Sequence, residues 1–187
     1  MLTNSMKTAI MDGRFEETEQ GIFVPSERSM IQGVVCYGKR GEPEEWTHNL
    51  IVGQGLNYLV GAATGSVSPI ANWYIAVFSG DVTVQASWTA SNFTAGATEF
   101  TDYVAANRPA WTPGAVASGA RDSFASKSTF ESSVAGAVIR GAALISASGK
   151  GATSGTLMGA TRFDTDKPLG VGEMLDVGYG LQITAVA

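Results

Sequence analysis

The sequence has very little of the two side chains on which most metal and redox sites depend. Cysteine and histidine each occur once in 187 residues, as Cys36 and His48. One thiol cannot form an internal disulfide, and zinc sites need clusters of Cys and His that one of each cannot supply. We therefore expect no metal and no other cofactor.

Positive charge is also scarce. The 12 Lys and Arg residues are outnumbered by 17 Asp and Glu, which gives a formal net charge of -5 and a pI near 4.8. An acidic chain has no basic field to attract a phosphate backbone, so nucleic-acid binding is disfavoured. The length of 187 residues suffices for one domain, with or without a tail, that buries its own core.

Long apolar runs are absent as well. Residues 47–79 contain no Asp, Glu, Lys or Arg, but Gly, Pro and Asn interrupt them, so they lack the roughly 18 consecutive apolar residues of a membrane span. The opening residues, MLTNSMKTAI, lack the apolar stretch of a signal peptide. We expect a protein without membrane partners that is made and kept in a cytoplasm.

Charge divides the chain into two regions. Residues 1–45 hold 13 of the 29 charged side chains (12 basic and 17 acidic), and residues 46–187 hold the other 16. The first region has little periodicity, and acidic runs separate its small apolar clusters. This pattern predicts an extended N-terminal arm at 1–45 with one strand near 30–37, followed by a body at 46–187.

The arm carries an apolar group that suggests a binding role. Its members are Phe15, Ile22, Phe23 and Val24. Burial of these four side chains gains about 6–12 kcal/mol in all, at about 1.5–3 kcal/mol each. Ordering even about twelve residues of the arm on an isolated body costs more, about 12–24 kcal/mol at about 1–2 kcal/mol per residue. We therefore expect the arm to order on a partner and to couple one subunit to its neighbours. A disordered tail without a role is the alternative.

Gly, Ala, Ser and Thr dominate the body, a composition that favours short strands over surface helices. The clearest strand is 174–184, in which apolar residues alternate with polar or small ones. The apolar residues are Leu175, Val177, Tyr179, Leu181 and Ile183. Further strands are predicted at 134–146, 155–163 and 72–79, with turns at 147–154 and 164–168.

One short helix is predicted, with Asn49 as its N-cap and a stop near Gly61. Several strands with few helical patterns between them favour a mostly β fold. We therefore predict a jelly-roll or Ig-like antiparallel β-sandwich, with one short helix and an extended N-terminal arm.

Candidate catalytic groups are few. Cys36 with His48 could form a nucleophile and base, but Cys36 lies in an apolar run where a buried thiol is ordinary packing. Glu99 and Asp102 could act as acid and base in glycoside hydrolysis, although in strand or loop geometry they need not converge. Solvated charges and core packing are the favoured interpretations, and we predict no enzyme activity and no catalytic residues.

Two further groups of residues allow binding. Asp164 and Asp166 could contribute to a calcium site, but two acids fall short of the six to eight oxygen ligands that calcium takes, and a turn is the better interpretation. Aromatic side chains could stack on sugars, and the candidates are Trp73, Trp88 and Trp111. Packing in a core explains these aromatic residues more simply.

The body also resembles a known family. The sequence NLIVGQGLNYL at 49–59, followed by NWYIAVFSG at 72–80, resembles small virion proteins of tailed bacteriophages. The order of similar segments continues with TEFTDY at 98–103, RPAW at 108–111, GTL at 155–157 and LGVGEML at 169–175. The resemblance covers about residues 46–187 and leaves the arm outside it.

The resemblance implies a jelly-roll or Ig-like sandwich associated with the phage head. The expected function is that of a non-enzymatic decoration or cement protein on the outer head surface, present in the host cytoplasm during assembly. Its expected partners are the major capsid protein and itself, as a homodimer or homotrimer. The alternatives are a structural protein of the tail or neck, and a carbohydrate-binding or receptor-binding module.

Overall fold

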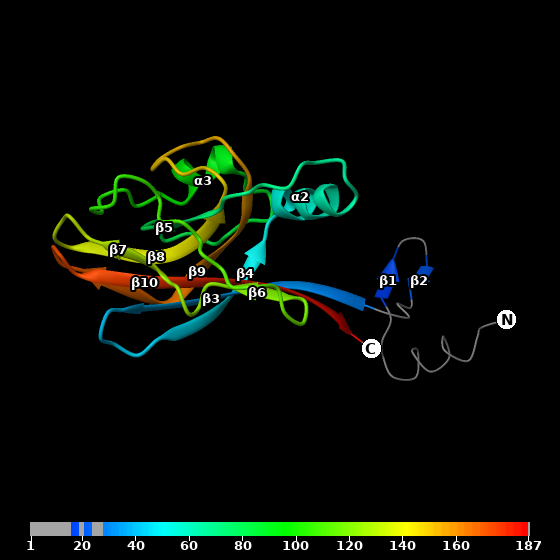
Figure 1. The fold of residues 1–187 in the computed structure, drawn as a ribbon, viewed down its shortest axis with the longest axis horizontal. Coiled ribbons are helices and arrows are strands. Elements are labelled where there is room, and N and C mark those ends of the chain that lie inside the picture. The colour runs from blue at the N-terminus through cyan, green and yellow to red at the C-terminus, as the bar shows by residue number, and fades with distance from the viewer. Residues whose placement is uncertain (1–15, 19–20, 24–27, 187) are drawn as a thin grey trace. The chain divides into compact units, whose positions relative to one another are not determined.

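The computed structural model describes residues 16–18, 21–23 and 28–186. The fold is mostly β, as predicted, and a curled antiparallel sheet forms a half-barrel (Figure 1). The chain divides into two compact units. The larger is Gln32–Gln182, and the described residues of the smaller are those up to Ile31 and those from Ile183 onward.

The sheet contains eight strands in the order β5-β8-β9-β4-β3-β10-β6, and β7 also pairs with β10. The strands are β3 (Arg28–Lys39), β4 (Glu45–Ile51), β5 (Tyr74–Phe78), β6 (Ala120–Asp122), β7 (Ser128–Glu131), β8 (Ala137–Ile145), β9 (Leu157–Leu169) and β10 (Met174–Val186). The helices of the described residues are α2 (Gly53–Ala63) and α3 (Ala90–Gly96).

The smaller unit contains a short hairpin, in which β1 (Glu16–Thr18) pairs antiparallel with β2 (Gly21–Phe23). Phe15 and Val24 lie outside the described residues, as do the side chains of Ile22 and Phe23. The partner-binding role of these four residues therefore stays a prediction. The strand expected near 30–37 is the longer β3, most of which belongs to the larger unit.

Strand β10 follows the predicted alternation over its first half. Leu175, Val177 and Tyr179 are fully buried, whereas Ile183 is 46 % exposed, because the core ends before it. The opposite face of β10 carries glycine where another side chain crosses it. A Cβ on Gly180 would lie 2.6 Å from Cζ of Phe124. Glycine therefore permits Phe124 to lie against the strand.

One side of β5 and β8 is covered by α3 and the loop before it. Phe78, Trp88 and Phe93 contact one another edge to face, with ring centroids 6.1–6.3 Å apart. This geometry is the favoured one for aromatic pairs. Because helix and loop cover this side, Gly141–Ile145 of β8 is buried on both faces. The continuous apolar run in β8 reflects that double burial.

The free edge of β5 is covered by the loop of residues 98–111. The Ile75 N–H donates to the carbonyl of Pro109, and the Phe100 N–H donates to that of Val77, each at 2.9 Å. Unpaired backbone groups at a strand edge promote association between sheets. Here the loop forms hydrogen bonds with those groups, so they are not free to pair with another strand.

The predicted turn at 164–168 is wrong, because β9 continues through it to Leu169 and pairs with β8. Cross-strand ion pairs hold its turn-like residues in the strand. Lys167 contacts Glu45 at 2.6 Å, and Asp166 contacts Arg140 at 2.9 Å. These partners are distant in sequence and overcome the local preference of Asp, Thr and Pro for turns.

The helix prediction needs two corrections. Helix α2 begins at Gly53 rather than after Asn49, which belongs to β4 and donates its side-chain amide to the Tyr179 hydroxyl. A second helix, α3, was not predicted. A capping box between Thr89 and Asn92 begins α3, and burial of Phe93 holds it on the sheet.

A truncation tests the placement of β10 in the core. Ending the chain before Asp176 removes Val177 and Tyr179, each worth about 1.5–3 kcal/mol of burial, together with the pairing partner of β3, β6 and β7. Net stabilities are only about 5–15 kcal/mol, so we expect insoluble protein. Ending the chain after Gln182 is the control and should leave a cooperative thermal transition. Cooperative unfolding of the shorter chain would show that β10 is dispensable.

Candidate functional site

Helix α2 packs on the sheet through its glycine and polar residues. A Cβ on Gly55 would overlap the carbonyl oxygen of Met158 in β9, so glycine permits the close approach. The Gln54 side-chain oxygen accepts hydrogen bonds from the backbone N–H groups of Ala90 (2.8 Å) and Leu157 (2.9 Å). These contacts fix which side of the helix faces the body.

Further along α2, Tyr58 continues the same packing side. Its hydroxyl accepts a hydrogen bond from the Ile70 N–H at 2.9 Å, and its ring meets Trp73 edge to face at 5.3 Å. The helix is therefore held by residues 54, 55 and 58, and the side that carries Leu56 and Val60 faces solvent.

The outward side of α2 is apolar. Leu56 is 41 % exposed and Val60 is 63 % exposed, and their spacing of four residues places them on one side of the helix. Ala63 is also exposed. Val67, 43 % exposed, flanks the helix, since a Cβ on Gly61 would lie 2.7 Å from its Cγ2. These four residues are called the α2 face below.

The α2 face reverses the usual distribution of side chains on a surface helix, which buries its apolar side and exposes charge. No charged residue occurs in residues 47–79, so none lies in the first or last turn of α2. Exposed apolar side chains without charge around them are typical of a binding site for another protein. The α2 face is therefore the candidate functional site.

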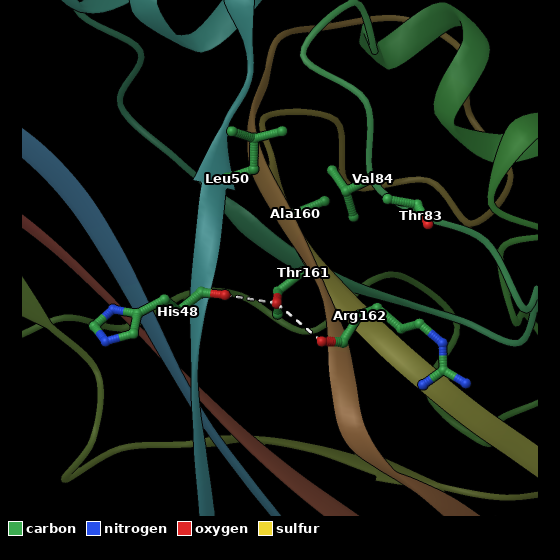
Figure 2. A pocket seen from close by; sticks show the side chains of 7 residues that line it. All are labelled: His48, Leu50, Thr83, Val84, Ala160, Thr161 and Arg162. Atoms are coloured by element: carbon green, nitrogen blue, oxygen red, sulfur yellow. Dashed lines mark hydrogen bonds between the residues drawn. The ribbon is translucent and has the colours of Figure 1, made fainter.

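A pocket of about 360 Å³ lies between β4, β9 and the loop after β5 (Figure 2). Leu50, Val84 and Ala160 supply its apolar lining. The imidazole of His48 points away from the pocket, and only its carbonyl faces inward, where it accepts from the Thr161 hydroxyl at 2.8 Å. The pocket suits an apolar group and brings no acid or base to it.

The cation at the rim of this pocket is already paired. The Arg162 guanidinium contacts Asp81 at 2.9 Å and Asp166 at 3.0 Å, and these carboxylates help to raise its pKa. Binding an anion here would require Arg162 to exchange these partners. The geometry therefore gives no anion-binding role to this rim.

The most deeply buried charges of the described residues are Arg108 and Glu99, whose side chains are at most 1 % exposed. Two parallel hydrogen bonds of 2.7 Å join the guanidinium to the carboxylate. The guanidinium also donates to the carbonyls of Ala147 (2.9 Å) and Ala152 (3.1 Å). The pair thus ties the loop of residues 99–108 to the loop of residues 147–152.

Lys150 reinforces the same connection between loops. Its ammonium donates to the carbonyls of Thr101 and Tyr103 and lies 3.9 Å from the centre of the Tyr103 ring. Such a cation over an aromatic face is attracted to it. Both loops are therefore held by charged groups whose hydrogen-bonding partners lie within the protein.

The carboxylate pairs considered from the sequence do not converge. Glu99 is engaged by Arg108, whereas Asp102 is exposed, so the interpretation of both as solvated charges is wrong for Glu99. Asp164 is exposed on β9, and Asp166 binds two arginines. Among the described residues, no group of three or more His, Cys, Asp or Glu side chains could hold a metal ion.

Cys36 and His48 lie on neighbouring strands, β3 and β4, in different settings. Cys36 is fully buried, and a Cβ on Gly178 would lie 2.7 Å from its Sγ, whereas His48 is exposed. Burial raises the pKa of the Cys36 thiol and so disfavours the reactive thiolate. This environment fits packing better than nucleophilic chemistry.

Two of the three tryptophans considered as sugar platforms are buried. Trp73 and Trp88 are each 8 % exposed, and the Trp111 indole donates to the Tyr179 carbonyl at 2.9 Å. Trp46 was not considered, yet it is 52 % exposed and contacts Phe124 edge to face. In the sequence, Trp46 stands between the polar residues Glu45 and Thr47, and this neighbourhood could have indicated that its side chain is exposed.

Comparisons with known proteins add no relative: neither a family model nor a curated protein matches the chain. Within the part of the chain that is described, no helix is long and apolar enough to cross a membrane.

Breaking the buried ion pair should be costly. Arg108→Met leaves the Glu99 carboxylate buried without its cation, and removal of one partner of such a pair costs about 3–5 kcal/mol of unfolding free energy. Urea unfolding measures the loss. Lys39→Met, which removes an exposed pair with Glu173, is the matched control and should leave the unfolding free energy almost unchanged. Equal losses for both variants would contradict the assigned role.

Thiol reactivity tests the environment of Cys36. We expect a disulfide reagent such as dithionitrobenzoate to label the native chain far more slowly than the urea-unfolded chain, because burial hinders access and raises the thiol pKa. Rapid labelling of the native protein would show an accessible, activated thiol and reopen the nucleophile hypothesis.

Proposed function

We propose that the chain is a non-enzymatic structural protein of a virus particle, a decoration or cement protein that binds the outer surface of an assembled phage head. The observation that carries the proposal is the α2 face, which is apolar and lies within a stretch without charge. The resemblance of residues 46–187 to small phage virion proteins is the reason to choose a capsid among protein assemblies.

The state of the candidate catalytic groups supports a role without catalysis. Cys36 is buried, and Glu99 is occupied by Arg108. The ion pairs within and between loops favour a rigid body, which suits a protein whose work is to hold its neighbours in place. A net charge of -5 also suits a protein outside the shell, since it has no attraction for the genome within.

A capsid lattice would multiply weak contacts. Each subunit of the major capsid protein recurs many times, so attachments that are modest singly become firm when several act together. We assign contact between neighbouring copies on the lattice to the α2 face, and attachment to the capsid to the N-terminal arm, with its apolar residues Phe15, Ile22, Phe23 and Val24. The proposed partners are therefore the major capsid protein and further copies of this chain.

Co-sedimentation with undecorated heads tests this function. The full-length chain should pellet with heads, whereas a variant lacking residues 1–27, which leaves β3 whole, should keep its melting temperature and lose attachment. The double variant Cys36→Ser, His48→Gln is the control: it should bind like the full chain, with a stability cost at Cys36 of up to about 1–3 kcal/mol.

Three outcomes would contradict the proposal. Failure of the folded full-length chain to pellet with heads would remove the decoration role. If negative-stain electron microscopy of the labelled chain on phage particles shows it at the tail or neck instead of the head, the chain is a structural protein of that part. Binding to a glycan array without binding to heads would identify a carbohydrate-binding or receptor-binding module.

A further inference from the structure

We propose that the α2 face binds the α2 face of a second copy of this chain, so that two copies pair about a two-fold axis. The inference rests on the proposed function and names the partner of the same surface. It is carried by the exposed side of α2, with Leu56 and Val60 at its centre and Val67 beside it.

The orientation of α2 is built into the body. Gly55 allows the helix to touch the backbone of β9, and the Gln54 side chain is hydrogen-bonded to three backbone groups, at Ala90, Leu157 and Gly155. Rotating the helix to bury Val60 would break these contacts and press a larger side chain against Met158. The apolar side therefore faces outward, and no described residue of the larger unit covers Leu56 or Val60.

The distribution of charge favours a second copy as the partner of this face. The chain has a net charge of -5, so two copies repel wherever their acidic surfaces meet. Residues 47–79 contain no charged side chain, and here two copies can meet without opposing like charges or burying an unpaired ion. A partner recognised by charge, such as a nucleic acid or a basic peptide, would find no complementary group on this face.

The geometry suits a small self-complementary interface. In a two-fold pair the same residues meet on both sides, so Val60 of each copy would lie near the axis, with Leu56 and Ala63 around it. The 11-residue helix is about 16 Å long, and two such helices pack about 8–10 Å apart. An interface of this size falls in the weak class, so association in solution should be in the micromolar range or weaker.

Sedimentation velocity of the full-length chain, from about 1 µM to about 1 mM, tests the pairing. The mass of the wild-type protein should rise from monomer toward dimer with concentration. Val60→Lys places a charge on the axis and should raise the dissociation constant at least tenfold. Val171→Lys, at an equally exposed valine (67 %) in the turn between β9 and β10, is the matched control and should associate like the wild type.

A mixing experiment identifies the two-fold contact. Val60→Lys and Val60→Glu should each remain monomeric alone, and an equimolar mixture should regain association because opposite charges then meet across the axis. Because Val60 is exposed, both variants should keep the far-UV circular dichroism and the melting temperature of the wild type.

A monomeric wild type at all concentrations overturns the inference, as does undiminished association of Val60→Lys. Failure of the proposed function is a separate result. If the chain pairs through α2 but does not pellet with heads, the pairing is supported and the decoration role is contradicted. If the chain pellets with heads but Val60→Lys still associates like the wild type, the decoration role is supported and the pairing through α2 is contradicted.

Discussion

The ion pair between Arg108 and Glu99 is the interaction on which much of the larger unit depends. Both charges are removed from water, and a bidentate contact with added carbonyl acceptors compensates for that loss. The acceptors, at Ala147 and Ala152, belong to a loop distant in sequence. Separating the two loops would take these carbonyl acceptors away from the buried guanidinium, so their hydrogen bonds hold in place the loop that covers the edge of β5.

With this edge covered, the sheet has few places to bind another chain through its backbone. At the opposite end, the carbonyl of Asp122 in β6 accepts from the Gly114 N–H at 2.9 Å, so that edge is also partly paired. This arrangement favours association through side chains. The α2 face is the surface that we propose for it, because the contacts of Gln54 and Gly55 leave Leu56 and Val60 facing solvent.

The sequence predicted features that depend on local pattern and missed those that depend on distant partners. The alternation around Val177 and Tyr179 identified β10, because a period of two residues directly reports one buried face. Glu99 was interpreted as solvated because nothing in the residues around it shows that Arg108 folds back onto it. The orientation of α2 was equally hidden, since it depends on the approach of Gly55 to β9.

Whether another copy of the chain covers the α2 face can be decided from the solvent exposure of the methyl groups on that face. Methyl NMR with a soluble paramagnetic probe reports that exposure for Leu56, Val60 and Val67 at low and high protein concentration. We expect these methyls to become protected from the probe as the protein concentration rises, while those of the exposed control Val171 do not. Equal exposure of all four at every concentration would contradict it.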